Sequence, residues 1–281
     1  MNVAIVGLGL IGASFGKSLI KNGGHKVFGY DINPDVVLKA ELVKAIDEPL
    51  NDNNISSVDL LIISVYPRAF KSVALEYLPK MKDGAVLMDF CGIKRGIEEE
   101  MKELSAKFPS VSFIGAHPMA GREFSGVDRS ISTLFDKATC VVVPVKADIF
   151  VLENIRDLLL SVGFSEMVFS TAYRHDEIIA FTSQLCHIVS NAFIKSPMAS
   201  SHFGFSAGSY KDLTRVARLN PTMWTELMMD NRDLLKDELN GLIARLMEYS
   251  NALETGDEQK LFDLLKEGSD LKISIDKGKY R

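Results

Sequence analysis

The sequence predicts an α/β protein with a doubly wound parallel sheet in an N-terminal domain and an all-α C-terminal domain. Up to about Ser170, short apolar runs rich in β-branched residues alternate with amphipathic segments of helical length. A glycine-rich turn follows the first apolar run, as it does where a strand leads into a helix. After Ser170 only helical periodicity remains. We therefore predict two domains, residues 1–170 and residues 171–281.

The apolar runs of the first domain are predicted to be buried strands, because continuous apolar segments are typical of a sheet covered on both faces. They are Val3–Val6, Lys26–Asp31, Leu60–Val65, Ala85–Phe90, Ser112–Ala116, Cys140–Val145 and Glu166–Phe169. Helices are expected between them. Ile11, Phe15 and Leu19 recur at helical spacing, and Asn33-Pro34 supplies an N-cap and a first-turn proline.

The second domain is predicted to consist of helices alone. The stripe Ile178, Thr182, Leu185, Val189 and Phe193 indicates a helix that ends near Pro197. A second stripe, opened by Asn220-Pro221, predicts one long buried helix, and an amphipathic segment follows at Asp257–Leu271. The second stripe runs through Trp224, Met228, Asn231, Leu235, Leu239, Leu242, Leu246 and Tyr249. Because this stripe is longer than so small a domain covers alone, we expect a homodimer through the C-terminal helices.

Composition excludes several classes of partner. Lysine and arginine number 32 against 37 aspartate and glutamate, a net charge of -5, so no overall positive field attracts nucleic acid or an anionic membrane. No segment is apolar for long enough to cross a bilayer, and glycines interrupt the apolar start where a signal peptide would be continuous. Cys91, Cys140 and Cys186 lack the spacing of a disulfide framework or a zinc site. We expect a cytoplasmic protein without a metal.

A glycine fingerprint of the Rossmann type links the first predicted strand to the first helix. Its residues are Gly7, Leu8, Gly9, Leu10, Ile11 and Gly12. The three glycines would permit a tight turn, close approach of a diphosphate and close packing of helix on strand. Asp31 ends the next strand, where a carboxylate accepts hydrogen bonds from ribose hydroxyls and repels a 2′-phosphate. No basic residue follows it closely, so we expect NAD, against the alternative of a turn that binds nothing.

Two further segments end predicted strands, on the edge where doubly wound sheets bind ligands. Ser64, Val65 and Tyr66 are expected to line the nucleotide crevice, although an ordinary turn explains them equally well. His117 follows another strand, where a neutral imidazole could take a proton from a hydroxyl while hydride leaves the same carbon. The alternative is a histidine that only hydrogen-bonds a turn, and the nucleotide fingerprint favours the base.

Several motifs in order resemble the prephenate dehydrogenase family, which oxidatively decarboxylates prephenate to 4-hydroxyphenylpyruvate in tyrosine biosynthesis. Besides the fingerprint they are Asp89-Phe90-Cys91-Gly92-Ile93-Lys94, His117-Pro118-Met119-Ala120-Gly121-Arg122-Glu123, His175-Asp176, Ser183-Gln184-Leu185-Cys186-His187, Lys211-Asp212-Leu213-Thr214-Arg215 and Pro221-Thr222-Met223-Trp224. The resemblance covers most of the chain.

The resemblance implies roles for individual residues. His117 would be the catalytic base, and His187 and Arg215 would bind the substrate, with the planar guanidinium of Arg215 gripping one of the two carboxylates of prephenate. Glu123 and Asp212 would be the acidic partners of this arginine, although two solvated surface carboxylates fit their spacing equally well. No chorismate mutase or regulatory domain is expected.

Two departures from the family pattern concern the expected site. Gly92 stands where the family usually has a serine that helps to orient the catalytic histidine or the substrate, so a water, a backbone group or Lys94 would have to replace that hydroxyl. The family's Ser-His-Leu-Pro-His is here Ser183-Gln184-Leu185-Cys186-His187, which keeps only the last histidine. Neither change removes the base or the guanidinium.

Other functions remain open at this point. Arogenate differs from prephenate only in an amino group in place of the keto group, and the residues above do not separate the two substrates. A related imine or β-hydroxyacid reductase would use a lysine of the helical domain, and neither Lys195 nor Lys211 has a convincing context. A non-catalytic NAD-sensing dimer would bind NAD without turning over any substrate.

Overall fold

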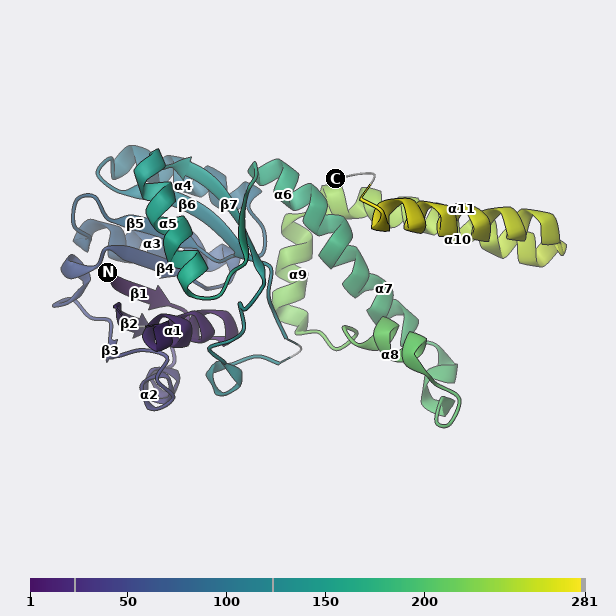
Figure 1. Ribbon diagram of the computed structural model, residues 1–281, viewed down its shortest axis with the longest axis horizontal. Helices are drawn as coiled ribbons and strands as arrows, with labels where there is room; N and C mark the ends of the chain where they lie inside the picture. Colours follow the sequence, from purple (N-terminus) through teal and green to yellow (C-terminus); the bar gives the residue numbers. More distant parts are fainter. Residues whose placement is uncertain (23, 123, 279–281) are drawn as a thin grey trace. The chain divides into compact units, whose positions relative to one another are not determined.

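The computed structural model describes residues 1–22, 24–122 and 124–278 (Figure 1). Its strands are β1 (Asn2–Val6), β2 (Lys26–Tyr30), β3 (Glu48–Pro49), β4 (Leu60–Ile63), β5 (Val86–Asp89), β6 (Ser112–Pro118), β7 (Thr139–Lys146) and β8 (Glu166–Phe169). The α-helices of the first part are α1 (Leu10–Asn22), α2 (Pro34–Leu42), α3 (Phe70–Tyr77), α4 (Arg95–Lys107) and α5 (Ile149–Ser161). Those that follow are α6 (Ala172–Ile179), α7 (Cys186–Phe193), α8 (Gly208–Thr214), α9 (Pro221–Asp230), α10 (Arg232–Thr255) and α11 (Glu258–Asp276). Each of the seven predicted strands is present, and the short strand β3 is additional.

The strands form one sheet of order β3-β2-β1-β4-β5-β6-β7-β8. Strands β1 to β6 run parallel, and the order reverses between β1 and β4, which creates the switch point where such sheets bind ligands. The predicted doubly wound fold is therefore confirmed. The sheet is not wholly parallel, because β7 runs antiparallel to β6. A parallel return needs a long crossover, usually a helix, whereas the described residues between these strands include only the short 3-10 helix η4 (Val127–Arg129).

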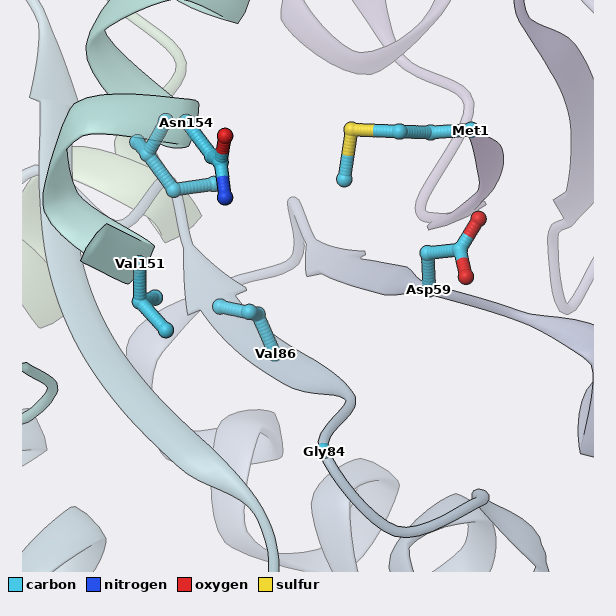
Figure 2. Close-up of a pocket in the computed structure, with 7 residues that line it drawn as sticks. Met1, Asp59, Gly84, Val86, Val151 and Asn154 are labelled. Atoms are coloured by element: carbon cyan, nitrogen blue, oxygen red, sulfur yellow. The ribbon is translucent and has the colours of Figure 1, made fainter.

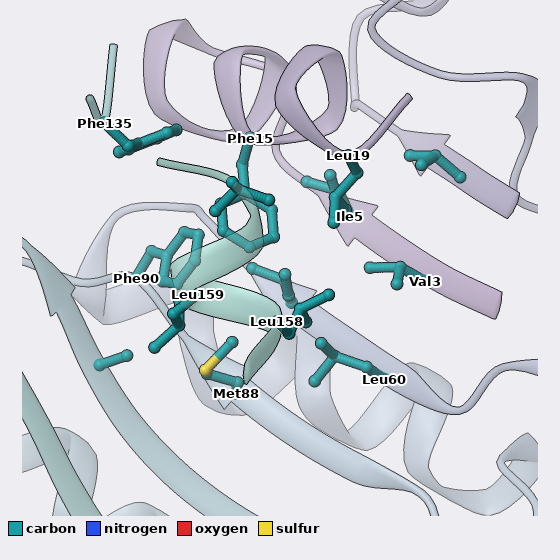
Figure 3. Close-up of a cluster of buried hydrophobic side chains, with 14 of the residues drawn as sticks. Val3, Ile5, Phe15, Leu19, Leu60, Met88, Phe90, Phe135, Leu158 and Leu159 are labelled. Carbon is teal, nitrogen blue, oxygen red and sulfur yellow. The ribbon is translucent and has the colours of Figure 1, made fainter. Parts of the chain in front are cut away.

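Side chains alternate between the two faces of the sheet and build two cores. Val3 and Ile5 join α1 and α5 on one face, together with Phe15 and Leu159 (Figures 1 and 3). Their neighbours Ala4 and Val6 belong to the other cluster, which α3 and α4 cover. Because successive residues of a strand point to opposite faces, each fully apolar strand serves both cores.

The helix predicted before Pro197 extends from Ala172 to Phe193 and contains a π-helical segment, Ala180–Leu185, between α6 and α7. Of the predicted apolar stripe, Leu185 alone is buried. Ile178 and Phe193 are exposed, and the buried side includes the polar residues His175, Asp176 and Gln184. The extra residue of a π turn rotates the second half of the helix relative to the first, so one regular stripe cannot describe both halves.

The single long helix predicted after Asn220-Pro221 is wrong, because the helix breaks at Asn231 into α9 and α10. The expectation that it is buried is also wrong for the single chain, where only Leu235 and Ala252 of α10 are buried. No glycine or proline marks the break. The buried Asn231 side chain instead bonds to other elements there.

The chain separates into two compact units, Met1–Arg232 and Asp233–Arg281. The second is a pair of helices, in which Lys260 pairs with Glu248 at 3.4 Å and the Tyr249 hydroxyl donates to the Leu264 carbonyl at 3.3 Å. A functional boundary near residue 170 remains a prediction. No helix among the described residues is both long and apolar enough to span a membrane.

Candidate functional site

The glycine turn between β1 and α1 has the geometry that the fingerprint predicts. Gly7 has φ +94°, and a Cβ there would lie 2.3 Å from the Ser64 carbonyl oxygen. A Cβ on Gly12 would lie 2.1 Å from the Gly7 oxygen, so helix and strand could not pack this closely. Gly9 differs, since nothing lies within 4 Å of its Cβ position. The backbone is therefore open at Gly9, just before the amino end of α1 begins at Leu10, where a diphosphate would be stabilised.

The other predicted nucleotide residues lie around this turn. Asp31 follows β2 and accepts hydrogen bonds from the amides of Leu8 (2.9 Å) and Asn33 (3.0 Å). The amide of Ser64 donates to the Val6 carbonyl at 2.7 Å, which places the segment after β4 against the turn. These residues share the carboxyl edge of the sheet, and they fit a dinucleotide.

A hollow of about 450 Å³ lies at the opposite edge, near the amino ends of β1, β4 and β5 (Figure 2). Met1, Asp59, Val86 and Asn154 line it. Asp59 is already engaged, because it accepts hydrogen bonds from Lys82 and from the amide of Asn2. Ligands of doubly wound sheets bind at the carboxyl ends of strands, so we place the site at the glycine turn and not in this hollow.

His117 is the next-to-last residue of β6, as predicted, and it begins a chain of hydrogen bonds. Its Nδ1 lies 2.8 Å from Nε2 of His175, and Nδ1 of His175 lies 2.7 Å from the carboxylate of Asp176. His175 and Asp176 belong to α6 and are buried. The sequence motif had drawn attention to this pair without giving it a role.

The protonation states of His117, His175 and Asp176 follow from their hydrogen bonds. Burial alone would raise the pKa of Asp176, but hydrogen bonds from His175 and from the amides of Arg95 and Lys94 hold it below its usual value. An ionised Asp176 requires a proton on Nδ1 of His175. Burial lowers the pKa of His175, so its ring is neutral and its Nε2 accepts from Nδ1 of His117. The tautomers assigned in this way leave the lone pair of His117 on Nε2.

His117 itself is poised as a neutral base. Burial lowers its pKa well below 6.5, and the neighbouring His175 and Lys94 lower it further. The imidazole is thus uncharged at neutral pH, with Nε2 able to accept a proton.

Asp176 also anchors α6 to the sheet domain. Its carboxylate accepts hydrogen bonds from the amides of Lys94 (2.7 Å) and Arg95 (2.9 Å), at the amino end of α4. A carboxylate at this position satisfies amides that have no partner within their own helix and faces the positive end of the helix dipole. Asn231 adds a link, because it accepts from the Arg95 guanidinium at 2.8 Å and donates to the Asp176 carbonyl at 2.9 Å.

Lys94 does not replace the missing serine hydroxyl in the way that the sequence allowed. Its ammonium group is buried and donates to Asp89 at 2.5 Å and to the carbonyl of Cys91 at 2.7 Å. These bonds shape the loop after β5 on which Gly92 lies. The ring of His117 is oriented by its hydrogen bond with His175.

The helical part contributes a second group of residues. The ring of His187, on α7, lies against Trp224 of α9 with centroids 4.0 Å apart, and its Nδ1 is 2.9 Å from the Ser183 carbonyl. Burial lowers the pKa of His187; the Ser183 bond opposes this effect, and the charge of Arg215 adds to it. Arg215, at the end of α8, therefore lies close enough to act on His187.

Helix α9 connects the two groups. A Cβ on Gly92 would lie 3.3 Å from Cδ2 of Leu227 and 4.0 Å from Nε2 of His117. Leu227 and Trp224 are three residues apart on α9, so their side chains lie on neighbouring positions of one face. One face of α9 thus passes from His117 to His187.

The glycine turn and this arrangement of histidines agree with comparisons of the whole chain. A family model described as "Prephenate dehydrogenase, nucleotide-binding domain" matches residues 15–167. The chain belongs to the prephenate dehydrogenase family. A second family model, "Prephenate dehydrogenase, dimerization domain", matches residues 171–267. The resemblance identified from the motifs is confirmed.

Known members of the prephenate dehydrogenase family are similar along nearly the whole chain. The cyclohexadienyl dehydrogenase of Zymomonas mobilis is 27% identical over 290 residues, which cover 98% of this chain and 96% of the relative. The prephenate dehydrogenase of Bacillus subtilis is 27% identical, with 97% and 76% covered. The crystal structure of prephenate dehydrogenase from A. aeolicus with hydroxyphenyl propionate and NAD+ superposes with a TM-score of 0.85, at 27% identity and 98% coverage of both chains.

In this member of the prephenate dehydrogenase family, the structure tests only part of the predicted residue set. Glu123 lies outside the described residues. Asp212 is exposed on α8, three residues before Arg215. Functional roles for Trp224 and Leu227 were not predicted from the sequence, and neither was the anchoring by Asp176. One signal for the last was available: His175 and Asp176 lie in a run of four titratable residues, from Arg174 to Glu177, shortly after the last strand.

Proposed function

We propose that this protein oxidatively decarboxylates prephenate to 4-hydroxyphenylpyruvate, with NAD as the hydride acceptor. The observation that carries the proposal is the chain His117, His175 and Asp176, which presents an unprotonated Nε2 beside the nucleotide edge of the sheet. Membership of the prephenate dehydrogenase family and the NAD+ named for the A. aeolicus structure support the choice of reaction and cofactor.

The nucleotide would be held by the residues around the glycine turn. The backbone from Gly7 to Gly12 would receive the diphosphate at the amino end of α1, and Asp31 would accept hydrogen bonds from the adenosine ribose. Ser64, Val65 and Tyr66 would border the same crevice. The exposed Ile32 after Asp31 offers no charge to a 2′-phosphate, which supports NAD over NADP. Bound NAD supplies the site that accepts hydride.

His117 would act as the general base. Its Nε2 takes the proton of the C4 hydroxyl as hydride leaves that carbon, and loss of carbon dioxide from C1 then makes the ring aromatic. The imidazolium that forms would be stabilised through His175 by the charge of Asp176. A general base of this kind contributes about 10² to 10⁴ in rate.

Residues of the helical part would hold the substrate. Arg215 would grip one carboxylate with its planar guanidinium, and the neutral ring of His187 would contact the side chain of the diacid. Asp212 and Glu123 would orient the arginine. The proposal requires His117 and Arg215 to contact one bound molecule, along the face of α9 that carries Leu227 and Trp224.

We also propose that the protein is a homodimer through its C-terminal helices, which the dimerization-domain match at residues 171–267 supports. A cytoplasmic location stays a prediction from the sequence.

The direct test is to mix purified protein with NAD and either prephenate or arogenate, and to follow NADH fluorescence. We expect NADH to form with prephenate. When NADP replaces NAD, NADPH should form much more slowly. Activity with arogenate alone would reassign the substrate. NAD binding without turnover of either compound would favour a non-catalytic sensor and would overturn the proposal.

A further inference from the structure

Gly92 lies beside the reactive nitrogen of His117, and its missing side chain leaves a space that another residue uses. The three atoms nearest its Cβ position are Cδ2 of Leu227 at 3.3 Å, Cδ1 of Leu227 at 3.7 Å and Nε2 of His117 at 4.0 Å. The backbone of Gly92 does not have the positive φ that would itself require glycine. The constraint at this position is therefore one of space, and Leu227 is the residue that would have to shift if a Cβ were added.

The backbone of Leu227 is held in place by a hydrogen bond from Gln184. Its carbonyl is one of the last four of α9, which have no partner within the helix, and it accepts a hydrogen bond from Nε2 of Gln184 at 2.8 Å. The carbonyl oxygen of the buried Gln184 side chain accepts in turn from Asn231 at 2.8 Å. This polar pair fixes the end of α9, so the Leu227 side chain is presented to Gly92 by a rigid element.

The space next to Nε2 of His117 is where the proposed reaction takes place. Nδ1 of His117 is engaged by His175, so Nε2 is the nitrogen that accepts the substrate proton in the proposed reaction. The Cβ position of Gly92 lies within 4.0 Å of both Nε2 and the Leu227 methyl groups, so a ring whose hydroxyl reaches Nε2 would lie close to Leu227. Leu227 is half-buried beside Gly92 and offers two methyl groups to an apolar ring.

We propose that Leu227 packs against the ring of the substrate at its reacting carbon, and that Gly92 and Leu227 are a matched pair that sets the position of that ring relative to His117. The inference rests on the proposed function. Leu227 would then determine specificity for a cyclic substrate. Its contact with the ring is one that neither Arg215 nor the nucleotide site provides.

The test is a double-mutant cycle of Gly92→Ala and Leu227→Ala. Alanine adds only the one carbon whose neighbours are known, without a hydroxyl that could bond to His117. In the wild-type background it should displace Leu227 by a few tenths of an ångström and lower kcat/KM for prephenate about threefold to tenfold, since about 1 Å of misplacement costs about 10²-fold. Leu227→Ala should raise KM for prephenate about tenfold through lost apolar contact and leave KM for NAD unchanged.

The decisive value is the effect of Gly92→Ala when residue 227 is already alanine. We expect less than a twofold change, because the displaced side chain is gone. Equal losses in both backgrounds, or a Leu227→Ala variant with normal KM for prephenate, would overturn the inference. Met229→Ala, on the exposed side of the same helix, is the matched control and should leave both KM values unchanged.

Thermal unfolding separates this inference from the proposed function. Gly92→Ala should lower the midpoint by about 3 °C in the wild-type background and should not lower it in Leu227→Ala, whatever the protein turns over. If the wild type oxidises neither prephenate nor arogenate, the proposed function fails. The substrate contact then fails with it, while the midpoints still decide whether the two residues form a pair.

Discussion

At the scale of single residues, the two ring nitrogens of His117 have different roles. Nδ1 of His117 is hydrogen-bonded to His175, and Nε2 lies 4.0 Å from the Cβ position of Gly92. The position of His117 at the end of a strand was predictable, since periodicity locates strands. Its orientation was not, because the partner that fixes the ring lies 58 residues away in sequence.

Replacing His117 by asparagine tests the base directly. Asparagine keeps a hydrogen-bonding group near His175 but cannot accept the hydroxyl proton, so kcat should fall by about 10² to 10⁴. Steady-state assays with saturating NAD measure this loss, and an unchanged thermal midpoint would establish that the fold is intact. Near-normal turnover would show that another group is the base.

The lowered pKa of His117 predicts the acid side of the pH profile. The base must be neutral to act, so activity is lost only as pH falls through its folded-state pKa, which burial holds well below 6.5. We expect kcat/KM for prephenate to be flat between about pH 8 and about pH 6.5 and to decline only below that range. A decline centred near pH 7 would contradict this assignment.

At the scale of elements, the carboxylate of Asp176 attaches α6 to the start of α4, beside the contact of the Arg95 guanidinium with the Tyr173 ring at 5.9 Å. Asp176 accepts two amides at the start of α4 and one hydrogen bond from His175. Helical periodicity predicted α6 but placed Ile178 on its buried side, where the structure has polar residues. Amphipathic patterns assume that burial selects apolar side chains, and this interface is held by hydrogen bonds instead.

Asp176→Asn should therefore weaken folding in a pH-dependent way. At pH 7 the apparent free energy of unfolding should fall by about 2 to 4 kcal/mol, as expected for loss of one partner in a buried charged network. Because the folded-state pKa of Asp176 is lowered, its contribution is present above the unfolded value near 3.9 and is lost as pH falls through the folded value.

Denaturant titrations at pH 7 and pH 3 measure this difference for wild type and variant. The gap between them should narrow at pH 3. The exposed Asp157 provides the matched control, and Asp157→Asn should change stability by less than about 0.5 kcal/mol. A pH-independent gap would mean that the charge of Asp176 contributes nothing.

The π-helical segment Ala180–Leu185 sets where His187 points. Deleting the exposed Thr182 should convert the segment to regular α-helix and rotate His187 by about 100° away from Trp224, since an α-helix turns through that angle per residue. KM for prephenate should rise more than tenfold while KM for NAD stays constant. Thr182→Ala, which keeps the register, should have neither effect; equal KM values for deletion and wild type would contradict the role of the segment.

At the scale of the whole molecule, the class of fold and the positions of seven strands along the chain were predictable from the sequence. The break at Asn231 and the antiparallel direction of strand β7 were not. Both depend on contacts between distant elements, such as the bond from Asn231 to Gln184, which no local propensity encodes. The nucleotide turn was predictable for the opposite reason, because glycines at close approaches leave a local signature.

The last two helices carry apolar side chains that the single chain leaves exposed. Leu246 is 56% and Met247 66% exposed on α10, and Phe262 is 59% and Leu265 56% exposed on α11. Apolar surfaces of this kind mark interfaces, and we expect the protein to have twice its chain mass of 31.1 kDa in solution.

Light scattering after size exclusion tests this expectation. Leu246→Glu combined with Leu265→Glu should shift the protein to the monomer mass, because unpaired charges would be buried at the interface. Glu254→Gln on α10 is the control and should remain a dimer. A wild-type protein of monomer mass at micromolar concentration would contradict the proposal.

The carboxylate of Asp176 also limits how the enzyme can release its product. Movement of α6 away from α4 would remove two amide donors from the buried Asp176 carboxylate. The same movement would break the hydrogen bond between His175 and His117. Release of the reduced nucleotide should therefore proceed through movement of surface loops, while the contact between α4 and α6 stays intact.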